Sequence, residues 1–330
     1  MKHVSILIPQ GQVIVDTIIG SLNLFQMANS FHRRNGLSEN GLYNLDLVGT
    51  TKEPQTYQQV ISIAPTKELS EVTKTDLIII PGFVGDMRKQ VEMNYQFVEW
   101  IKTHRIRHSA ELASLCRGAF LLAETGLMYG KSCATHWLTH NDFRRMYPNV
   151  NLAPEKVISE DNGIYSSGGA YSFLNLLLYL IEKHYGRETA IWCSKVAEIE
   201  FDRIDQNQFT IFNGQKNHHD QDIANIQDYI EQHYWEKINV EQLAEQVSTS
   251  SRNFIRRFKK ATNNTPIEYI QRVRIEAAKK KLESSTKSIL QVMYEISYND
   301  DKTFRNLFKR YTGMTPLGYR NKYNREMALV

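Results

Sequence analysis

The last third of the chain contains an internal repeat with an offset of 50 residues. Phe254 and Phe258 of the first copy match Phe304 and Phe308 of the second. Both copies continue with two basic residues, a Thr-Pro dipeptide and a tyrosine, so they share the pattern F-x-x-x-F-[KR]-[KR], T-P and Tyr. Because many residue types recur in the same order, the pattern indicates a duplicated structural unit.

Each copy also predicts two helices joined by a tight turn. In the first copy, Asn239 can cap a helix over 240–247, and the turn at 248–250 caps the next helix. The second copy repeats this arrangement, with Ser288 as the cap of a helix over 289–296. A helix, a short turn and a second helix form the DNA-binding unit whose second helix enters the major groove.

Charge agrees with a nucleic-acid partner for this part of the chain. Residues 250–330 carry 18 lysines and arginines against 7 acidic residues, a net charge of +11. A segment this basic suggests a polyanionic partner, although an ordinary solvated surface can be equally charged. The arrangement of the charges therefore has to decide between the two readings.

The second helix of each copy separates an apolar face from a polar one. The phenylalanines of the repeat, together with Ala261 and Tyr311, are expected to face the core. Arginine and asparagine on the opposite face can read guanine and adenine edges, and lysine is better placed to hold phosphate. The predicted DNA contacts are Ser251, Arg252, Ile255, Arg256, Lys259, Lys302, Thr303, Arg305, Asn306 and Lys309.

These stretches resemble the DNA-binding domain of the AraC/XylS family, over about residues 222–323. The matching segments read LAEQVSTSSRNFIRRFKKATNNTPIEYIQRVRIEAAKKKL and SILQVMYEISYNDDKTFRNLFKRYTGMTPLGYR. The resemblance implies two helix-turn-helix units joined by a long helix, bound to double-stranded DNA. Two positions depart from the family pattern: Met293 replaces a small residue, and Ser297 replaces the usual turn glycine.

The first part of the chain alternates short apolar strands with helices. This alternation predicts a parallel sheet covered by helices on both faces. Residues 205–222 are polar and read as a linker. The strands are expected at 3–8, 42–49, 60–64, 76–81, 111–115 and 163–167, and the helices at 20–34, 95–104, 117–125 and 170–184.

Cys116 lies between an apolar strand and a glycine-containing helix start, in the sequence ASLCRGA. This is the context of a nucleophile elbow. The helix dipole and the adjacent Arg117 would both favour a thiolate at this position. A lone cysteine in such a core nevertheless serves packing more often than chemistry.

The wider pattern resembles the PfpI-like, class I glutamine-amidotransferase-like domain that precedes the DNA-binding domain in a subgroup of AraC-type regulators. It spans about residues 3–200, in the segments LIPQGQVIVDTIIGSLNLFQMAN, DLIIIPGFVGD, SLCRGAFLLAETGLMYGKSCATHW and YSSGGAYSFLNLLLYLIEKHYG. The resemblance implies a flavodoxin-like α/β sandwich. The fold class expected for the whole chain is thus such a sandwich followed by an all-α domain with two helix-turn-helix units.

The features that catalytic relatives share are altered here. Arg117 follows the cysteine where such relatives have histidine, and Asn23 stands where family members carry an acid in the first helix. Bulky Phe83 follows Gly82 in the loop that would hold an oxyanion. We therefore expect a non-enzymatic domain that senses a small molecule or dimerises, with a pocket lined by Asn23, Gly82, Phe83, Cys116, Arg117 and His136. The alternatives are a cysteine-dependent hydrolase or amidase, and a redox sensor, both at Cys116.

Other features bound the remaining functions. Three cysteines without framework spacing predict neither a disulfide scaffold nor a zinc site, and His218-His219-Asp220 lacks further ligands, so no metal or cofactor is expected. There is no signal-peptide pattern, and the apolar run at 173–181 is too short to span a bilayer. These features predict a cytoplasmic protein without a membrane partner.

The predicted organisation has three parts. Residues 1–204 form the sensor domain, 205–221 the linker and 222–330 the DNA-binding domain. The stretch 222–249 is acidic and would be repelled by DNA, so it is expected to face the first domain or a partner such as RNA polymerase. A small-molecule effector and a homodimer complete the expected partners of an activator or repressor.

Overall fold

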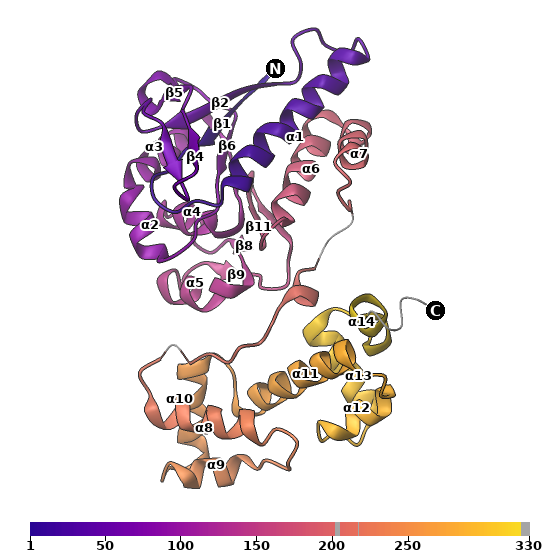
Figure 1. Ribbon diagram of the computed structural model, residues 1–330. Helices are drawn as coiled ribbons and strands as arrows, with labels where there is room; N and C mark the ends of the chain where they lie inside the picture. The colour runs from indigo at the N-terminus through magenta and orange to yellow at the C-terminus, as the bar shows by residue number, and fades with distance from the viewer. Residues whose placement is uncertain (202–204, 217, 325–330) are drawn as a thin grey trace. The chain divides into compact units, whose positions relative to one another are not determined.

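The chain forms two compact units, Met1–Gln206 and Asn207–Val330, in a computed structural model that describes residues 1–201, 205–216 and 218–324 (Figure 1). Residues 202–204, 217 and 325–330 lie outside the described residues. The excluded positions take in the end of the predicted sensor domain, one position of the predicted linker and the end of the predicted DNA-binding domain.

The first unit is built on a seven-stranded sheet with the strand order β10-β11-β7-β6-β1-β2-β5. All neighbouring strands pair in parallel except β10 with β11. The central strand β6 reads LIII and is buried along its whole length, as expected of a parallel strand covered on both faces. The strands are β1 (Lys2–Leu7), β2 (Tyr43–Gly49), β5 (Lys67–Glu68), β6 (Leu77–Ile80), β7 (Glu111–Ser114), β10 (Ile158–Asp161) and β11 (Ile164–Ser167).

Helices cover the two faces of this sheet (Figure 1). On one side, α1 (Val15–Arg34), α6 (Ser172–Tyr185) and α7 (Arg187–Val196) pack against one another. On the other side lie α2 (Met87–Met93), α3 (Tyr95–His108) and α4 (Ala119–Glu124). This arrangement confirms the flavodoxin-like sandwich.

Several short elements lie outside the main sheet. The strand expected at 60–64 is β4 (Ile61–Ile63), which forms a separate hairpin with β3 (Gln55–Tyr57) instead of joining the seven strands. Two of its three residues are exposed, so it lacks the buried faces of a sheet strand. A further parallel pair, β8 (Ser132–Cys133) with β9 (Asn151–Leu152), frames α5 (His140–Met146).

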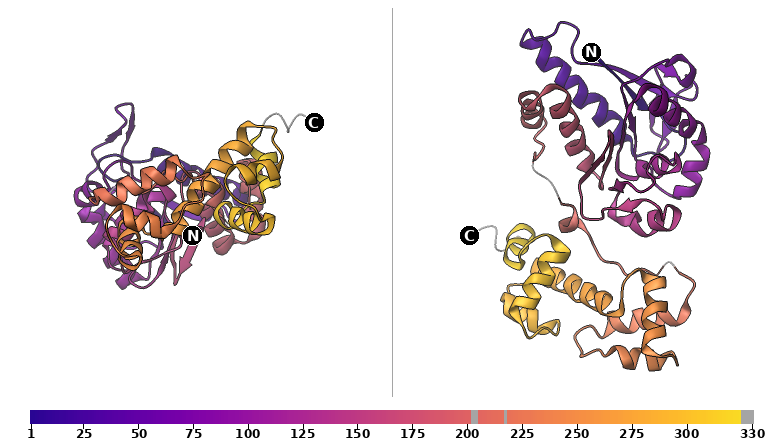
Figure 2. Two further views of the ribbon diagram at one scale, coloured as in Figure 1. Left: turned by 90° about the horizontal axis from the view of Figure 1, so that it is seen from below. Right: turned by 180° about the vertical axis from the view of Figure 1, so that it is seen from behind.

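The second unit is helical in its described residues and contains the two predicted repeats. The first repeat holds α9 (Val240–Gln246) and α10 (Ser251–Thr262), and the second holds α12 (Ile289–Glu295) and α13 (Asp301–Thr312). The long helix α11 (Pro266–Ser284) joins them, while α8 (Gln221–Gln232) packs on the first repeat and α14 (Pro316–Tyr323) on the second (Figures 1 and 2). The all-α domain with two helix-turn-helix units is therefore confirmed.

Each repeat has its own apolar core, and α11 contributes to both. Its N-terminal half supplies Tyr269 and Ile270 to the first core, around Phe254 and Phe258. Its C-terminal half supplies side chains to the second core, around Phe304 and Phe308, namely Ile275, Ala278 and Leu282. The two repeats thus pack on opposite ends of one helix.

The turns within the two repeats use the same backbone conformation. Ser248 and Ser297 both have a positive φ, 50° and 64°, so the serine that departs from the family pattern in the second repeat has a counterpart in the first. A residue other than glycine costs about 1 kcal/mol in this region. The second helices of the two repeats, α10 and α13, likewise end on left-handed residues, Asn263 and Gly313.

Much of the predicted linker lies along the second unit, and we call residues 207–216 the strap. Its backbone is held by α11: the Lys279 ammonium donates to the Thr210 carbonyl at 2.6 Å, and the Phe212 amide donates to Glu276 at 3.1 Å. The Phe212 ring meets the Tyr269 ring edge-on at 5.1 Å. The strap is therefore a packed part of the helical unit.

Candidate functional site

The recognition helices α10 and α13 expose the same positions. Burial follows an identical order in the ten residues from 251 and in the ten residues from 301, with the phenylalanines fully buried. All but one of the predicted DNA contacts are exposed, and Ser251 is half-buried. The exposed members are Arg252, Ile255, Arg256, Lys259, Lys302, Thr303, Arg305, Asn306 and Lys309.

Neighbouring side chains hold two of the exposed arginines in place. In α10, a terminal nitrogen of Arg256 donates to the Asn253 amide oxygen at 2.8 Å. In α13, Nε of Arg305 donates to both carboxylate oxygens of Asp301, at 2.8 and 2.7 Å. The sequence reasoning did not select Asn253 or Asp301, although their spacing of three and four residues from the arginines could have indicated these contacts.

Arg257, which lies next to Arg256, has a different role. Its guanidinium makes ion pairs with Asp220 at 2.6 Å and Asp222 at 2.7 Å, before and within the first turn of α8. The hydrogen bonds that Arg257 donates to these two carboxylates raise its pKa above the usual range. Arg257 therefore attaches α10 to α8.

The elbow at Cys116 has the geometry that the sequence predicted. Cys116 follows β7 with a φ of 54°, and a single 3₁₀ turn, Cys116–Gly118, leads into α4. A Cβ added to Gly118 would lie 2.5 Å from the carbonyl oxygens of Ile80 and Pro81, so only glycine fits there. The strand–turn–helix arrangement thus places Cys116 at the carboxyl edge of the sheet.

The surroundings of Cys116 contradict the expectation of a thiolate. Its side chain is fully buried, and burial raises the pKa of the thiol, although the Ala170 backbone and Arg117 act in the opposite direction. The amide of Cys116 donates to Ser167 Oγ at 3.2 Å, and its carbonyl accepts from Thr135 Oγ1 at 2.9 Å. Cys116 is therefore a protonated thiol, because loss of solvent outweighs the nearby positive charge.

The loop after β6 lies against the elbow, as expected. A Cβ added to Gly82 would be 3.2 Å from Cys116 Cβ, which shows how closely the two residues approach. The Gly82 amide, the donor that an oxyanion would need, already donates to Thr17 Oγ1 at 3.1 Å. Phe83 is fully buried and pairs with Val13 in an isolated bridge.

The other predicted pocket residues differ in their placement. His136 is half-buried, and burial together with Arg117 lowers its pKa to about 4, so its imidazole is neutral at pH 7. Its Nδ1 accepts from the Leu138 amide at 3.1 Å. Asn23 is exposed on α1, where Thr17 and not Asn23 contacts the Gly82 loop. Thr17, Ser167 and Thr135 were not predicted, because they come from separate segments of the chain.

One polar atom beside the elbow has no partner. Nε of Arg117 is buried without a hydrogen bond among the described residues. Gln206 lies nearby: its side-chain amide donates to the Thr135 carbonyl at 3.2 Å and accepts from the Gly169 amide at 3.2 Å. Gly169 in turn abuts His136, since a Cβ there would lie 2.7 Å from the imidazole.

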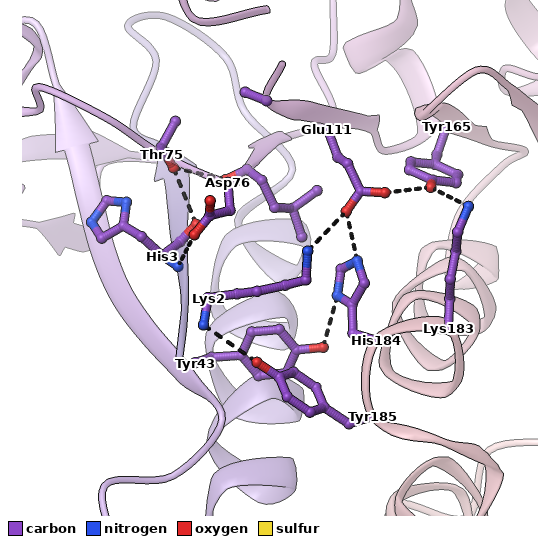
Figure 3. Close-up of polar contacts among 12 residues, drawn as sticks. Lys2, His3, Tyr43, Thr75, Asp76, Glu111, Tyr165, Lys183, His184 and Tyr185 are labelled. Carbon is purple, nitrogen blue, oxygen red and sulfur yellow. Dashed lines mark hydrogen bonds and ion pairs between the residues drawn. The ribbon is translucent and has the colours of Figure 1, made fainter. Parts of the chain in front are cut away.

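A second polar cluster occupies the opposite edge of the sheet, where β1, β2 and β7 begin (Figure 3). Glu111 accepts hydrogen bonds from His184 and Tyr165, both at 2.7 Å, and Tyr43 contacts His184 at 3.1 Å. Burial of Glu111 opposes its ionisation, but the bonds from His184 and Tyr165 prevail and lower its pKa to about 2. This cluster fastens the end of α6 to the sheet and lies away from the elbow.

Among the described residues, no group of three or more His, Cys, Asp and Glu side chains could hold a metal ion. No described helix is long and apolar enough to cross a membrane.

Comparisons with known proteins agree with this architecture. The DJ-1/PfpI family matches residues 15–183, and a helix-turn-helix domain matches residues 243–322. The transcriptional regulator GbdR of Pseudomonas aeruginosa is 24% identical over 78% of this chain and 69% of its own length. The regulator CdhR of the same species is 22% identical over 90% of this chain and 85% of its own length.

Solved structures share the fold of the first unit. An AraC family transcriptional regulator from Pseudomonas putida has a TM-score of 0.50 at 14% identity, covering 60% of this chain and all of that one (100%). Drosophila melanogaster DJ-1beta has a TM-score of 0.50 at 16% identity, covering 60% of this chain and 98% of that one. The chain therefore belongs to the DJ-1/PfpI family and, through its helix-turn-helix domain, is a DNA-binding transcription regulator of the AraC type.

Proposed function

We propose that α10 and α13 read base sequence in two successive major grooves, about 10 bp apart on one face of the DNA. This proposal is supported mainly by the matched pattern of exposed and buried residues in the two helices. The helix α11 contributes to the cores of both repeats and so holds α10 and α13 together. The second unit of one chain would therefore read an asymmetric DNA site.

The exposed side chains divide into two roles in this proposal. Arg256, Arg305 and Asn306 carry the bidentate donors and acceptors that distinguish base pairs. Lys259 and Lys309 lie nearer the ends of the helices and would neutralise phosphate. Footprinting of the full chain on its own promoter region tests the proposal. Protection of two adjacent major-groove segments is expected, and protection of a single segment would contradict it.

The first unit, in our proposal, is a sensor without catalytic activity. The thiol of Cys116 is buried, the Gly82 amide is already bonded to Thr17, and the His136 imidazole already accepts a bond from its own turn. An acyl-transfer site needs an ionised or activated nucleophile and free donors for the oxyanion. These contacts therefore favour sensing over catalysis.

The elbow is the proposed binding region for a small-molecule effector. The buried Nε of Arg117 would gain most from an anionic group such as a carboxylate, because a buried unpaired donor is costly. Arg117→Met removes both the Nε donor and the positive charge, whereas Arg117→Lys removes the Nε donor and keeps the charge. Comparing the two variants separates the effect of the donor from that of the charge. Carboxylate metabolites are expected to raise the melting temperature of the unchanged protein only, and an equal rise in Arg117→Met would refute this site.

Coupling between effector and DNA would pass along the chain itself. Gln206 is buried against Thr135 and Gly169 at the elbow, and the residues that follow it form the strap on α11. A change at the elbow could thus alter how the strap is held, with a coupling of about 1–3 kcal/mol. In the full chain, Gln206→Ala should reduce the difference in operator affinity with and without effector. An unchanged difference would exclude this route.

Further partners follow from the surfaces of the two units. Glu241 and Glu245 are exposed on α9 and would be repelled by DNA, so we propose that they face a protein such as RNA polymerase. Ile19 on α1 and Val196 on α7 are exposed apolar residues that a homodimer would cover. Both assemblies would form in the cytoplasm. Sedimentation of the full chain, alone and with polymerase, tests them.

The second candidate is a cysteine hydrolase or redox sensor at Cys116, favoured by the elbow geometry alone. Turnover or a peroxide response that Cys116→Ser abolishes would establish it. We expect neither, and we expect slow labelling of Cys116 by mild electrophiles, because a buried protonated thiol reacts poorly.

A further inference from the structure

We propose that Asp301 is a specificity-determining residue that orients Arg305 toward a guanine. The inference rests on the proposed reading of DNA by α13. Asp301 would make no base contact itself and would act only by positioning Arg305.

The contact geometry leaves the reading edge of the arginine open. Asp301 engages Arg305 through Nε, which donates to both carboxylate oxygens. Among the described residues, no hydrogen bond is found for the two terminal nitrogens of Arg305. Those nitrogens can donate in parallel to O6 and N7 of guanine, the most common specific contact in the major groove. Asp301 therefore restricts the guanidinium without occupying the atoms that read the base.

Asp301 is not required as a helix cap, because Asp300 has that role. The Asp300 side chain accepts from the Thr303 amide at 2.7 Å and begins α13. Both Asp301 and Arg305 are about half exposed, at 45% and 46% of their side chains, so neither is needed to fill the core. This leaves the arginine as the interaction partner of Asp301.

The other recognition helix lacks this device. Fifty positions earlier, the residue equivalent to Asp301 is Ser251, and the residue equivalent to Arg305 is Ile255. The reading arginine of α10, Arg256, is held by the neutral amide of Asn253 instead. A carboxylate near DNA is repelled by phosphate, whereas an amide is not. Asp301 should therefore lower binding to random DNA while it favours one base pair at the position that Arg305 reads.

The experiment compares base preference and total affinity in the full chain. Operators carrying each of the four base pairs at the position read by Arg305 are tested, together with random DNA. Asp301→Ser, which copies the first repeat, should reduce the preference for guanine about tenfold, the lower range of a lost bidentate contact. It should also bind random DNA more tightly. Glu245→Ser removes an exposed acid from α9 and is the matched control, with base preference unchanged.

Testing Asp301→Ser in the Arg305→Ala variant distinguishes positioning of the arginine from direct contact with a base. In that variant, the further change Asp301→Ser should leave base preference as it is. If preference changes there, Asp301 contacts a base itself and the positioning proposal is wrong. If Arg305→Ala relaxes the preference but Asp301→Ser alone does not, the proposal is also overturned. If Arg305→Ala leaves every base preference intact, the reading of DNA by α13 has failed instead. Melting temperatures of all variants reveal any loss of folding.

Discussion

The two helix-turn-helix units have the same frame and different surfaces. In both, two phenylalanines of the recognition helix are buried, and a serine with positive φ makes the turn. The outer faces of their first helices, α9 and α12, differ. Two and six residues after the cap, α9 exposes Glu241 and Glu245, whereas α12 exposes Leu290 and Tyr294. Repetition of the core fixes where the recognition helices lie, while the surface residues decide what each half contacts.

The largest expected effect tests whether the apolar cores of the two repeats contribute equally to stability. Phe254→Ala and Phe304→Ala each remove a fully buried ring and should lower the free energy of unfolding by about 3–5 kcal/mol. Urea unfolding, followed by the helical signal, measures both. Ile255→Ala, an exposed change in α10, is the control and should cost far less. A difference of several kcal/mol between the two phenylalanine variants would break the comparison.

The next effect separates the two recognition surfaces. Arg256→Ala and Arg305→Ala should each weaken operator binding by about 1–3 kcal/mol, and each should relax preference at a different base pair. Lys309→Ala should weaken binding to all sequences and reduce the salt dependence by about one charge. Competition assays against single-base variants of the operator provide the measurement. Loss of preference at the same base pair in both arginine variants would contradict two separate reading helices.

A smaller effect concerns the turns. Ser248→Gly and Ser297→Gly relieve left-handed strain and should each raise stability, by at most about 1 kcal/mol, because glycine also loses more chain entropy. Thermal unfolding of the two variants measures the gain. Similar shifts would strengthen the view that both turns are built alike, whereas a loss of stability in either would refute it.

The smallest expected effect depends on pH and comes from one ion pair of the first helix-turn-helix repeat. In α10, Arg257 pairs with Asp220, whereas α13 has the apolar Leu307 at the equivalent position. Burial opposes ionisation of Asp220, but the bond from Arg257 lowers its pKa. A lowered folded-state pKa stabilises the protein above the usual carboxyl pKa of about 3.9, and this stability is lost as the pH falls through the lower folded-state value.

For a partly exposed pair the expected loss is only about 0.2–1 kcal/mol. Hydrogen exchange should therefore show a difference in the opening of α8 and α10 between pH 6 and pH 3. Asp220→Asn, which keeps a capping oxygen for the Ile223 amide, should abolish the difference. The same acid sensitivity of α8 and α10 in Asp220→Asn and in the unchanged protein would contradict this explanation.

How far the sequence predicted the molecule depends on whether local pattern or distant packing decides. The repeat predicted both helical units because the phenylalanine spacing and the caps are local features. Helix α1 begins at Val15, earlier than the expected residue 20, because tertiary packing overrides the β-branched residues at its start. The short helices α2 and α7 were not predicted.

At the candidate site, local geometry was predicted and environment was not. The elbow turn at Cys116 follows from a strand, a glycine and a helix that adjoin in the sequence. The state of its thiol depends on burial by Gly82, Thr135 and Ser167, which lie in three distant segments. The orientation of Asn23 depended on the exact phase of α1, which a family pattern at low identity does not define.

The strap also determines where the helical unit can be cut. A chain that began at residue 222 would lose the Phe212 ring from its contact with Tyr269. It would also leave the nearly buried Lys279 without the Thr210 carbonyl that accepts its bond. Limited proteolysis should accordingly release a stable fragment that starts close to Asn207, because cleavage inside the strap would uncover apolar and charged surface together. For cloning or crystallisation, the useful border of the helical unit lies before the strap, well ahead of its first helix.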